Sequence, residues 1–198
     1  MNAFLPRRAS RFSLRARTLV SRSFALGLSL SGGLAGEAVA RAPVGPSSDH
    51  VGFPATYRAE FQVLRAFNKT DALQVVTVYG NASAASVTNL TQVPFPYGSV
   101  LVMETAAAAK DPQGKPILDS HGNYRPDKVA GMHVMRREKN FGNEYGADRS
   151  GEWDFVEYGA DGSYLTPPDK SSKCAACHLK AGVARDFVYR AGLPAASK

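Results

Sequence analysis

The amino-acid sequence predicts a mainly β protein of the α+β class, built on one antiparallel β-sheet with a few short helices. From about residue 53 onward, apolar residues recur closer to every second position than to every 3.6 positions, which is typical of half-buried strands. The alternating runs are short, rich in β-branched and aromatic residues, and bounded by Gly, Asn or Pro. Both observations favour strands that are joined by turns.

Four of these runs predict strands. The segment after the first of them, residues 81–92, predicts one short helix. A long polar segment, residues 110–128, has turn signals at both ends and predicts a hairpin around residues 119–123. The four predicted strands are residues 73–80 (LQVVTVYG), 98–105 (GSVLVMET), 131–138 (GMHVMRRE) and 151–159 (GEWDFVEYG).

An earlier run, residues 59–67, fits two structures. It alternates as a strand does, with Arg65 as the one polar residue on its apolar face. Tyr57, Phe61 and Leu64 also form a stripe at helical spacing. We expect a strand here, with a helix as the alternative.

The first 40 residues have the composition of a cleavable signal peptide. Residues 1–22 contain six arginines and no acidic residue, and a short run of apolar and small residues follows them. Ala38 and Ala40 fit a small-x-small cleavage site. The apolar run is too short and too rich in glycine and serine to span a membrane. We therefore expect cleavage after residue 40, export to the periplasm and no membrane span in the mature chain.

Removal of this segment changes the charge balance. The whole chain has 24 Lys and Arg against 17 Asp and Glu, and residues 41–198 keep 18 against 16, a net charge of +2. They contain no basic run with interleaved aromatics, so the sequence does not favour nucleic-acid binding. We expect a flexible Pro/Gly/Ser-rich lead-in over residues 41–52 and one domain over residues 53–198.

The strongest chemical signal is the stretch CAACH, which contains Cys174, Cys177 and His178. A covalent c-type haem uses this pattern, because two cysteines with two residues between them reach both porphyrin vinyl groups and the next residue lies under the iron. A dithiol oxidoreductase also uses two cysteines at this spacing, but in a βαβ unit that the sequence does not show. A structural zinc site needs a second pair of ligands, and the chain has no further cysteine. The motif therefore predicts one covalently attached haem c, with iron bound by His178.

A resemblance to a known family rests on five stretches in a fixed order. The sequence resembles the cytochrome P-460 superfamily, which includes the cytochromes c-prime-beta, from about Phe53 to Arg190. The resemblance implies an antiparallel β fold, a homodimer, and one covalent haem with His178 as proximal ligand and a distal side open to small ligands. The stretches that carry it are FPATYR, PFPYGSVLVMET, GEWDFVEYG, CAACH and RDFVYR.

Met103 is the main departure from that family. The P-460 enzymes oxidise hydroxylamine and link a lysine to the porphyrin, and the matching position in GSVLVMET is Met103. A thioether cannot replace an amine in that bond, so the resemblance now points to c-prime-beta proteins, which bind nitric oxide and related gases. Met103 has three readings: packing in the core or at the haem edge, axial ligation of the iron, or a reactive redox role.

His133 is the candidate for the distal side. By the resemblance, a polar or acidic residue from the run 131–138 lies over the haem, and a hand alignment puts it at His133. Alternation places His133 and Met135 on one face of that strand. A neutral histidine there would act as an acid and base on a bound oxygen species. The alternative is a surface histidine, because a register slip of one residue reverses both faces.

Three functions follow from these observations. The first is an exported mono-haem protein that binds nitric oxide or a similar small ligand at an open distal site. The second is a haem enzyme with peroxidase-like or hydroxylamine-oxidising activity, and the third is an electron-transfer cytochrome with histidine and methionine on the iron. The sequence does not identify the electron donor or acceptor protein. By the resemblance, Phe61 and Phe67 are candidates for an apolar cap over the distal side, but packing in the core is the role that we expect for each of them singly.

Overall fold

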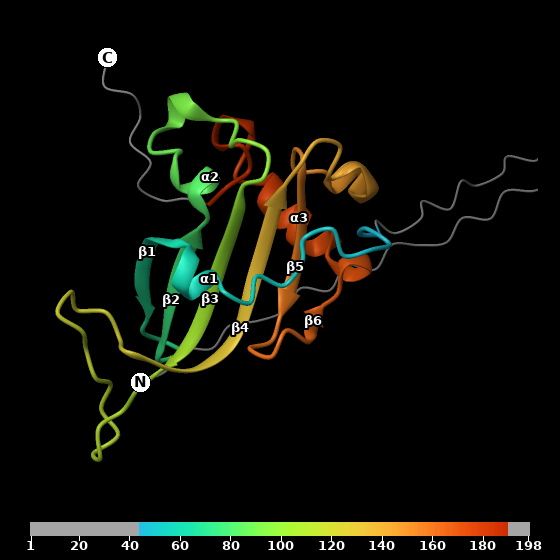
Figure 1. Ribbon diagram of the computed structural model, residues 1–198. Coiled ribbons are helices and arrows are strands. Elements are labelled where there is room, and N and C mark those ends of the chain that lie inside the picture. The colour runs from blue at the N-terminus through green and yellow to red at the C-terminus, as the bar shows by residue number, and fades with distance from the viewer. Residues whose placement is uncertain (1–43, 190–198) are drawn as a thin grey trace, which may run out of the picture. The chain divides into compact units, whose positions relative to one another are not determined.

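The computed structural model describes residues 44–189, so the predicted signal peptide and the first three residues of the lead-in lie outside the described part. Within it, six strands form one antiparallel sheet in the order β1-β2-β3-β4-β5-β6, each strand next to its neighbour in sequence (Figure 1). The predicted fold class is confirmed. No helix among the described residues is long and apolar enough to cross a membrane.

The helices and strands are mostly short. Turns and loops join them, and the loop between the third and fourth strands, coloured yellow-green in Figure 1, extends away from the sheet. The strands are β1 (Gln62–Lys69), β2 (Gln74–Gly80), β3 (Val100–Ala108), β4 (Pro126–Arg137), β5 (Trp153–Tyr158) and β6 (Tyr164–Thr166); the helices are α1 (Tyr57–Glu60), α2 (Ala82–Ala85) and α3 (Ser172–Leu179); and the 3-10 turns are η1 (Leu90–Gln92), η2 (Asn143–Asp148), η3 (Pro168–Lys170) and η4 (Val183–Arg185).

The ambiguous first run contains both predicted structures. The helical turn α1 begins at Tyr57, and strand β1 follows from Gln62. A bulge between Val63 and Arg65 interrupts the alternation of β1. The apolar residues of this run fit neither period alone, because the run includes the end of a helical turn and the start of a bulged strand.

Two other predictions differ from the structure. Residues 81–92 form α2 and the separate turn η1 instead of one helix, because the Asn89 side chain accepts from the backbone of Thr91 and starts a new capped turn. Strand β6 was not predicted, since three residues are too few to show a period. The hairpin around residues 119–123 is present, with Asp119 N donating to Asn123 O at 2.8 Å.

One face of the sheet is closed by the N-terminal segment and α1. We call it the closed face; in Figure 1 this segment and α1 cross in front of the strands. Aromatic rings fill it, for example Tyr57 against Tyr79 with 5.0 Å between ring centroids. Residues 44–52, the expected lead-in, contain no helix or strand, yet Asp49 accepts hydrogen bonds from Tyr158 and Tyr164. The buried cluster of the closed face is Val51, Tyr57, Val102, Met132, Val134, Val156 and Tyr158.

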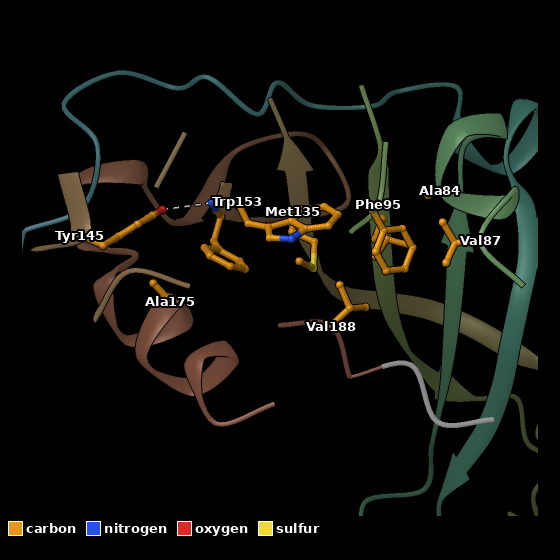
Figure 2. Packing of buried hydrophobic residues seen from close by; sticks show 10 residues of the cluster. Ala84, Val87, Phe95, Met135, Tyr145, Trp153, Ala175 and Val188 are labelled. Carbon is orange, nitrogen blue, oxygen red and sulfur yellow. Dashed lines mark hydrogen bonds between the residues drawn. The ribbon is translucent and has the colours of Figure 1, made fainter. Parts of the chain in front are cut away.

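The opposite face, which we call the groove face, is only partly covered. Figure 2 shows the covered part, where Phe95 packs edge-on against Trp153 at 5.7 Å and Tyr145 lies near α3. The remaining part carries Met103 and His133, which are directly paired across β3 and β4. The buried cluster of the groove face is Ala84, Val87, Phe95, Leu101, Met135, Tyr145, Trp153, Phe155, Ala175 and Val188.

Candidate functional site

The CAACH stretch forms most of helix α3, and buried hydrogen bonds fix the start of this helix on the sheet. Ser171, the residue before α3, is fully buried, and its hydroxyl lies 2.9 Å from the Tyr145 hydroxyl. The Tyr145 hydroxyl also accepts from the backbone N–H of Phe155 in β5 at 3.1 Å, the dashed line in Figure 2. Ala175 is fully buried on the inner side of α3, where its small side chain lets the helix lie close to the core. The helix is thereby held at a fixed position over β5.

The two cysteines form no disulfide and lie three residues apart on α3, so they share one side of the helix. Cys174 is half-buried and Cys177 is exposed. Burial raises the pKa of the Cys174 thiol, and the nearby Glu157 carboxylate raises it further. Dithiol oxidoreductases need a thiol whose pKa is lowered, and they place it after a strand of a parallel βαβ unit. The antiparallel sheet and the raised pKa both count against that alternative.

His178 is oriented by a backbone carbonyl. Its Nδ1 lies 2.7 Å from the carbonyl oxygen of Phe187. A carbonyl only accepts, so Nδ1 carries the hydrogen and Nε2 keeps its lone pair free for a metal. Burial lowers the pKa of His178, which keeps the ring neutral. The ring lies between Phe155 and Tyr189, at centroid distances of 4.7 and 5.4 Å.

The carbonyl that orients His178 is itself held by a buried network around Asp186. The Asp186 carboxylate accepts from the backbone N–H of Phe95 at 2.9 Å and lies 3.3 Å from Nε of Arg137. Its backbone carbonyl accepts from the indole N–H of Trp153 at 3.0 Å. Asp186 and Phe187 both have left-handed backbone angles, with φ of 48° and 61°. These contacts hold the chain in a sparsely populated conformation that turns the Phe187 carbonyl toward His178.

A cavity of about 440 Å³ lies between α3 and the groove face of the sheet. Cys174, Cys177 and His178 line it from α3, and Met103 and His133 line it from the sheet. The structure therefore brings all five sequence-predicted site residues to one cavity. Its walls are otherwise mostly apolar: Val78, Leu101, Val134, Met135, Phe155, Val156 and Val188.

His133 is half-exposed at this cavity and contacts a carboxylate. Its Nε2 lies 3.4 Å from Oε1 of Glu157, the residue opposite it on β5. The other oxygen of Glu157 accepts from the hydroxyl of Thr166 at 2.8 Å. Thr166 in turn pairs with Glu157 across β5 and β6. Nε2 of His133 therefore faces a carboxylate that Thr166 also binds. Nδ1 is the other nitrogen of the His133 ring.

Sequence reasoning singled out neither Glu157 nor Arg65 as site residues, although both break an apolar face. Glu157 follows Trp153 and Phe155 at alternate positions and lines the cavity with Phe155. Arg65 lines an adjoining hollow of about 300 Å³, together with Phe67. Phe61 packs on the closed face, in agreement with the expected core packing and not with the alternative of a cap over the cavity. The bulge after Val63 is the physical reason, because it breaks the alternation that joined Phe61 to Phe67.

The side chains at the cavity fit an iron porphyrin. They supply two thiols at the spacing for thioether bonds, one neutral imidazole nitrogen and a mostly apolar surround. Among residues 44–189, no group of three or more His, Cys, Asp or Glu side chains is arranged to hold a metal ion without such a cofactor.

Comparison with known families agrees with this chemistry. The sequence model of the family described as cytochrome P460 matches residues 54–190. The chain belongs to the cytochrome P460 family. Membership of the cytochrome P460 family implies a haem protein. A search of curated proteins finds no match.

Proposed function

We propose that this cytochrome P460 family member is an exported c-type mono-haem protein that binds nitric oxide or a similar small ligand at a distal site on the groove face. Cys174 and Cys177 would hold the haem through thioether bonds, and Nε2 of His178 would bind the iron. The observation that carries the proposal is the single cavity shared by these three residues, Met103 and His133. An iron porphyrin supplies a metal centre that binds diatomic ligands and changes oxidation state.

The protein's own residues prepare the site for that role. The Phe187 carbonyl fixes the tautomer of His178, and Phe155 and Tyr189 flank its ring. The mostly apolar walls of the cavity favour a small uncharged ligand over an ion. Met103, at the position of the family's cross-linking lysine, has no amine with which to form that bond.

The test is the absorption and magnetic resonance spectrum of the ferric and ferrous holoprotein, with and without nitric oxide. We expect haem that stays with the polypeptide after denaturing extraction in the wild type and is lost in Cys174→Ser/Cys177→Ser. Met103→Leu keeps the side-chain volume and removes the sulfur, with Met135→Leu as the matched control in the same cavity. An open site predicts that both variants keep the wild-type coordination. A low-spin six-coordinate wild type that opens only in Met103→Leu would instead support the electron-transfer alternative.

A second candidate function is peroxidase-like turnover, and the contact between His133 and Glu157 favours it. Nε2 of His133 lies 3.4 Å from Oε1 of Glu157 and the residue lines the cavity, which supports a role for its free Nδ1 as acid and base on a ligand there. We expect His133→Ala to lower peroxide turnover by at least about tenfold and Glu157→Gln to lower it less. If both variants keep the wild-type rate with peroxide and with hydroxylamine, the ligand-binding function alone remains.

Export to the periplasm, the homodimer and an electron-transfer partner remain predictions. Gel filtration of the holoprotein tests the dimer, and the mass of the mature protein from a cell envelope fraction tests cleavage after residue 40.

A further inference from the structure

The groove on the sheet continues beyond the cavity that holds the CAACH residues. The adjoining hollow of about 300 Å³ shares Val78, Leu101, Met103, Val188 and Tyr189 with that cavity. Its walls are almost entirely apolar apart from two guanidinium groups, Arg65 from β1 and Arg185 from η4. Both arginines line the hollow and neither lines the cysteine cavity. The groove therefore has a thiol end and a cationic end.

The register of the sheet shows which strands lie at the thiol end and which lie at the cationic end of the groove. Arg65, Val78, Met103, His133 and Glu157 are paired in one row across β1 to β5. Four strand spacings separate the ends of this row, or about 19 Å between backbones. Glu157 is close enough to Cys174 to raise its pKa. The cysteines therefore lie toward β5, and the arginine of the row lies at the far edge of the sheet.

The two arginines have no acidic partner among the described residues. The ion pairs in residues 44–189 involve neither of them. Arg65 instead lies over the ring of Phe67, with 4.6 Å from its guanidinium carbon to the ring centroid. A guanidinium is planar, and one that rests on an aromatic ring keeps the N–H donors at its edge free, which suits two-point binding of a carboxylate.

We propose that Arg65 and Arg185 form a carboxylate-binding site for the two haem propionates. The proposal rests on the proposed thioether attachment, because a porphyrin bound through its vinyl edge presents its propionates at the opposite edge. Two carboxylates beside an apolar groove need cationic partners. The cationic end of the groove supplies two of them on different elements, β1 and the segment after α3. The propionates thereby join the C-terminal segment to the edge of the sheet.

The test is the reduction potential of the holoprotein at low ionic strength in Arg65→Gln, Arg185→Gln and the double variant. Loss of a positive charge beside the haem stabilises the ferric state, so the potential falls in each single variant and further in the double variant. The shift shrinks as salt is added. Arg125→Gln, which removes an exposed arginine that lines neither hollow, keeps the wild-type potential. Lysine at both positions keeps the positive charges, so the double lysine variant should keep most of the wild-type potential. A double variant with covalent haem and the wild-type potential would overturn the proposal.

Two further outcomes separate the proposal from its alternatives. If the site binds a free carboxylate, acetate added at constant ionic strength changes the potential and spectrum of the wild type but not of the double variant, and this result overturns the propionate assignment. We expect no response to acetate in either protein. Haem that is extracted from the denatured wild type would overturn the thioether attachment itself, and the propionate site with it. Propionate-bending bands in the resonance Raman spectrum, shifted in the double variant but not in Arg125→Gln, would give independent support.

Discussion

The two faces of the sheet are made by alternate residues of the same strands, yet they differ in how far their side chains are buried and bound. On the closed face, Glu104 is 2% exposed and is bound by the Tyr57 hydroxyl and the Arg58 guanidinium. On the groove face, its neighbour Met103 is 36% exposed, although it lies on a central strand. A polar group buried without partners costs free energy, so the closed face supplies partners from its own chain. The groove face leaves its middle uncovered, where Met103 and His133 line the cavity beside α3.

The largest expected effect is a difference in stability between variants of the neighbours Glu104 and Met103. Glu104→Ala removes the acceptor of the buried Tyr57 hydroxyl and the partner of Arg58, so we expect the free energy of unfolding to fall by about 3 kcal/mol. Met103→Ala should cost about 1 kcal/mol, because that side chain is already partly exposed, and should change the haem spectrum more than Glu104→Ala does. Chemical denaturation of the two holoproteins, followed by tryptophan fluorescence, measures the difference. Equal costs would mean that Met103 belongs to a packed core.

A smaller effect is expected at Asp186, which acts on the groove face through a backbone carbonyl. Asp186→Ala leaves the buried N–H of Phe95 without its acceptor, at a cost of about 2 kcal/mol. The Phe187 carbonyl should also turn away from His178, which weakens electron donation by the imidazole and raises the reduction potential. Asp169→Asn, at an exposed aspartate, is the control. A loss of stability with an unchanged potential would restrict Asp186 to a structural role.

The smallest effect concerns the attachment of the N-terminal segment to the closed face. Burial alone would raise the pKa of Asp49, but hydrogen bonds from Gly52, Tyr158, Tyr164 and Val51 together lower it below 3.8. A carboxylate with a lowered folded-state pKa stabilises the fold fully above the unfolded pKa, and this contribution is lost as pH falls through the folded pKa. Asp49→Asn should therefore cost less than about 1 kcal/mol at neutral pH, since the site is partly exposed.

The melting temperature between about pH 2.5 and pH 7 measures this contribution. The curves of the wild type and Asp49→Asn should converge at the acidic end, whereas Asp127→Asn, at an exposed aspartate, should follow the wild type throughout. Parallel curves for Asp49→Asn and the wild type would show that Asp49 acts as a hydrogen-bond acceptor regardless of its charge.

The fold class was accessible from the sequence for a physical reason, and the motif that predicts a haem anchor is likewise a local pattern. Strand alternation is a local pattern, and the CAACH spacing is set by the distance between two vinyl groups, so neither requires knowledge of distant contacts. The pairing of Met103 with His133 depends on the register of β3 and β4, which no local pattern fixes. The sequence left open which way Met103 and His133 face, and the register places them opposite one another on the groove face.

The residues that complete the site were harder to predict because they come from other elements. The Phe187 carbonyl belongs to the backbone and has no side-chain signature in the sequence. Arg65 was visible as a polar residue on an apolar face, but the bulge after Val63 altered which of its neighbours share that face. Bulges and left-handed turns are set by tertiary contacts, so local periodicity cannot locate them.

The order of the elements along the chain also sets an order in time. Every strand pairs with its neighbour in sequence, and all six precede Cys174, so a chain that emerges N-terminus first presents the whole sheet before α3. Such local pairing favours rapid folding. If haem is joined to Cys174 and Cys177 as proposed, the cofactor would meet a chain whose sheet has already formed, and its attachment would compete with the packing of α3 onto the groove face.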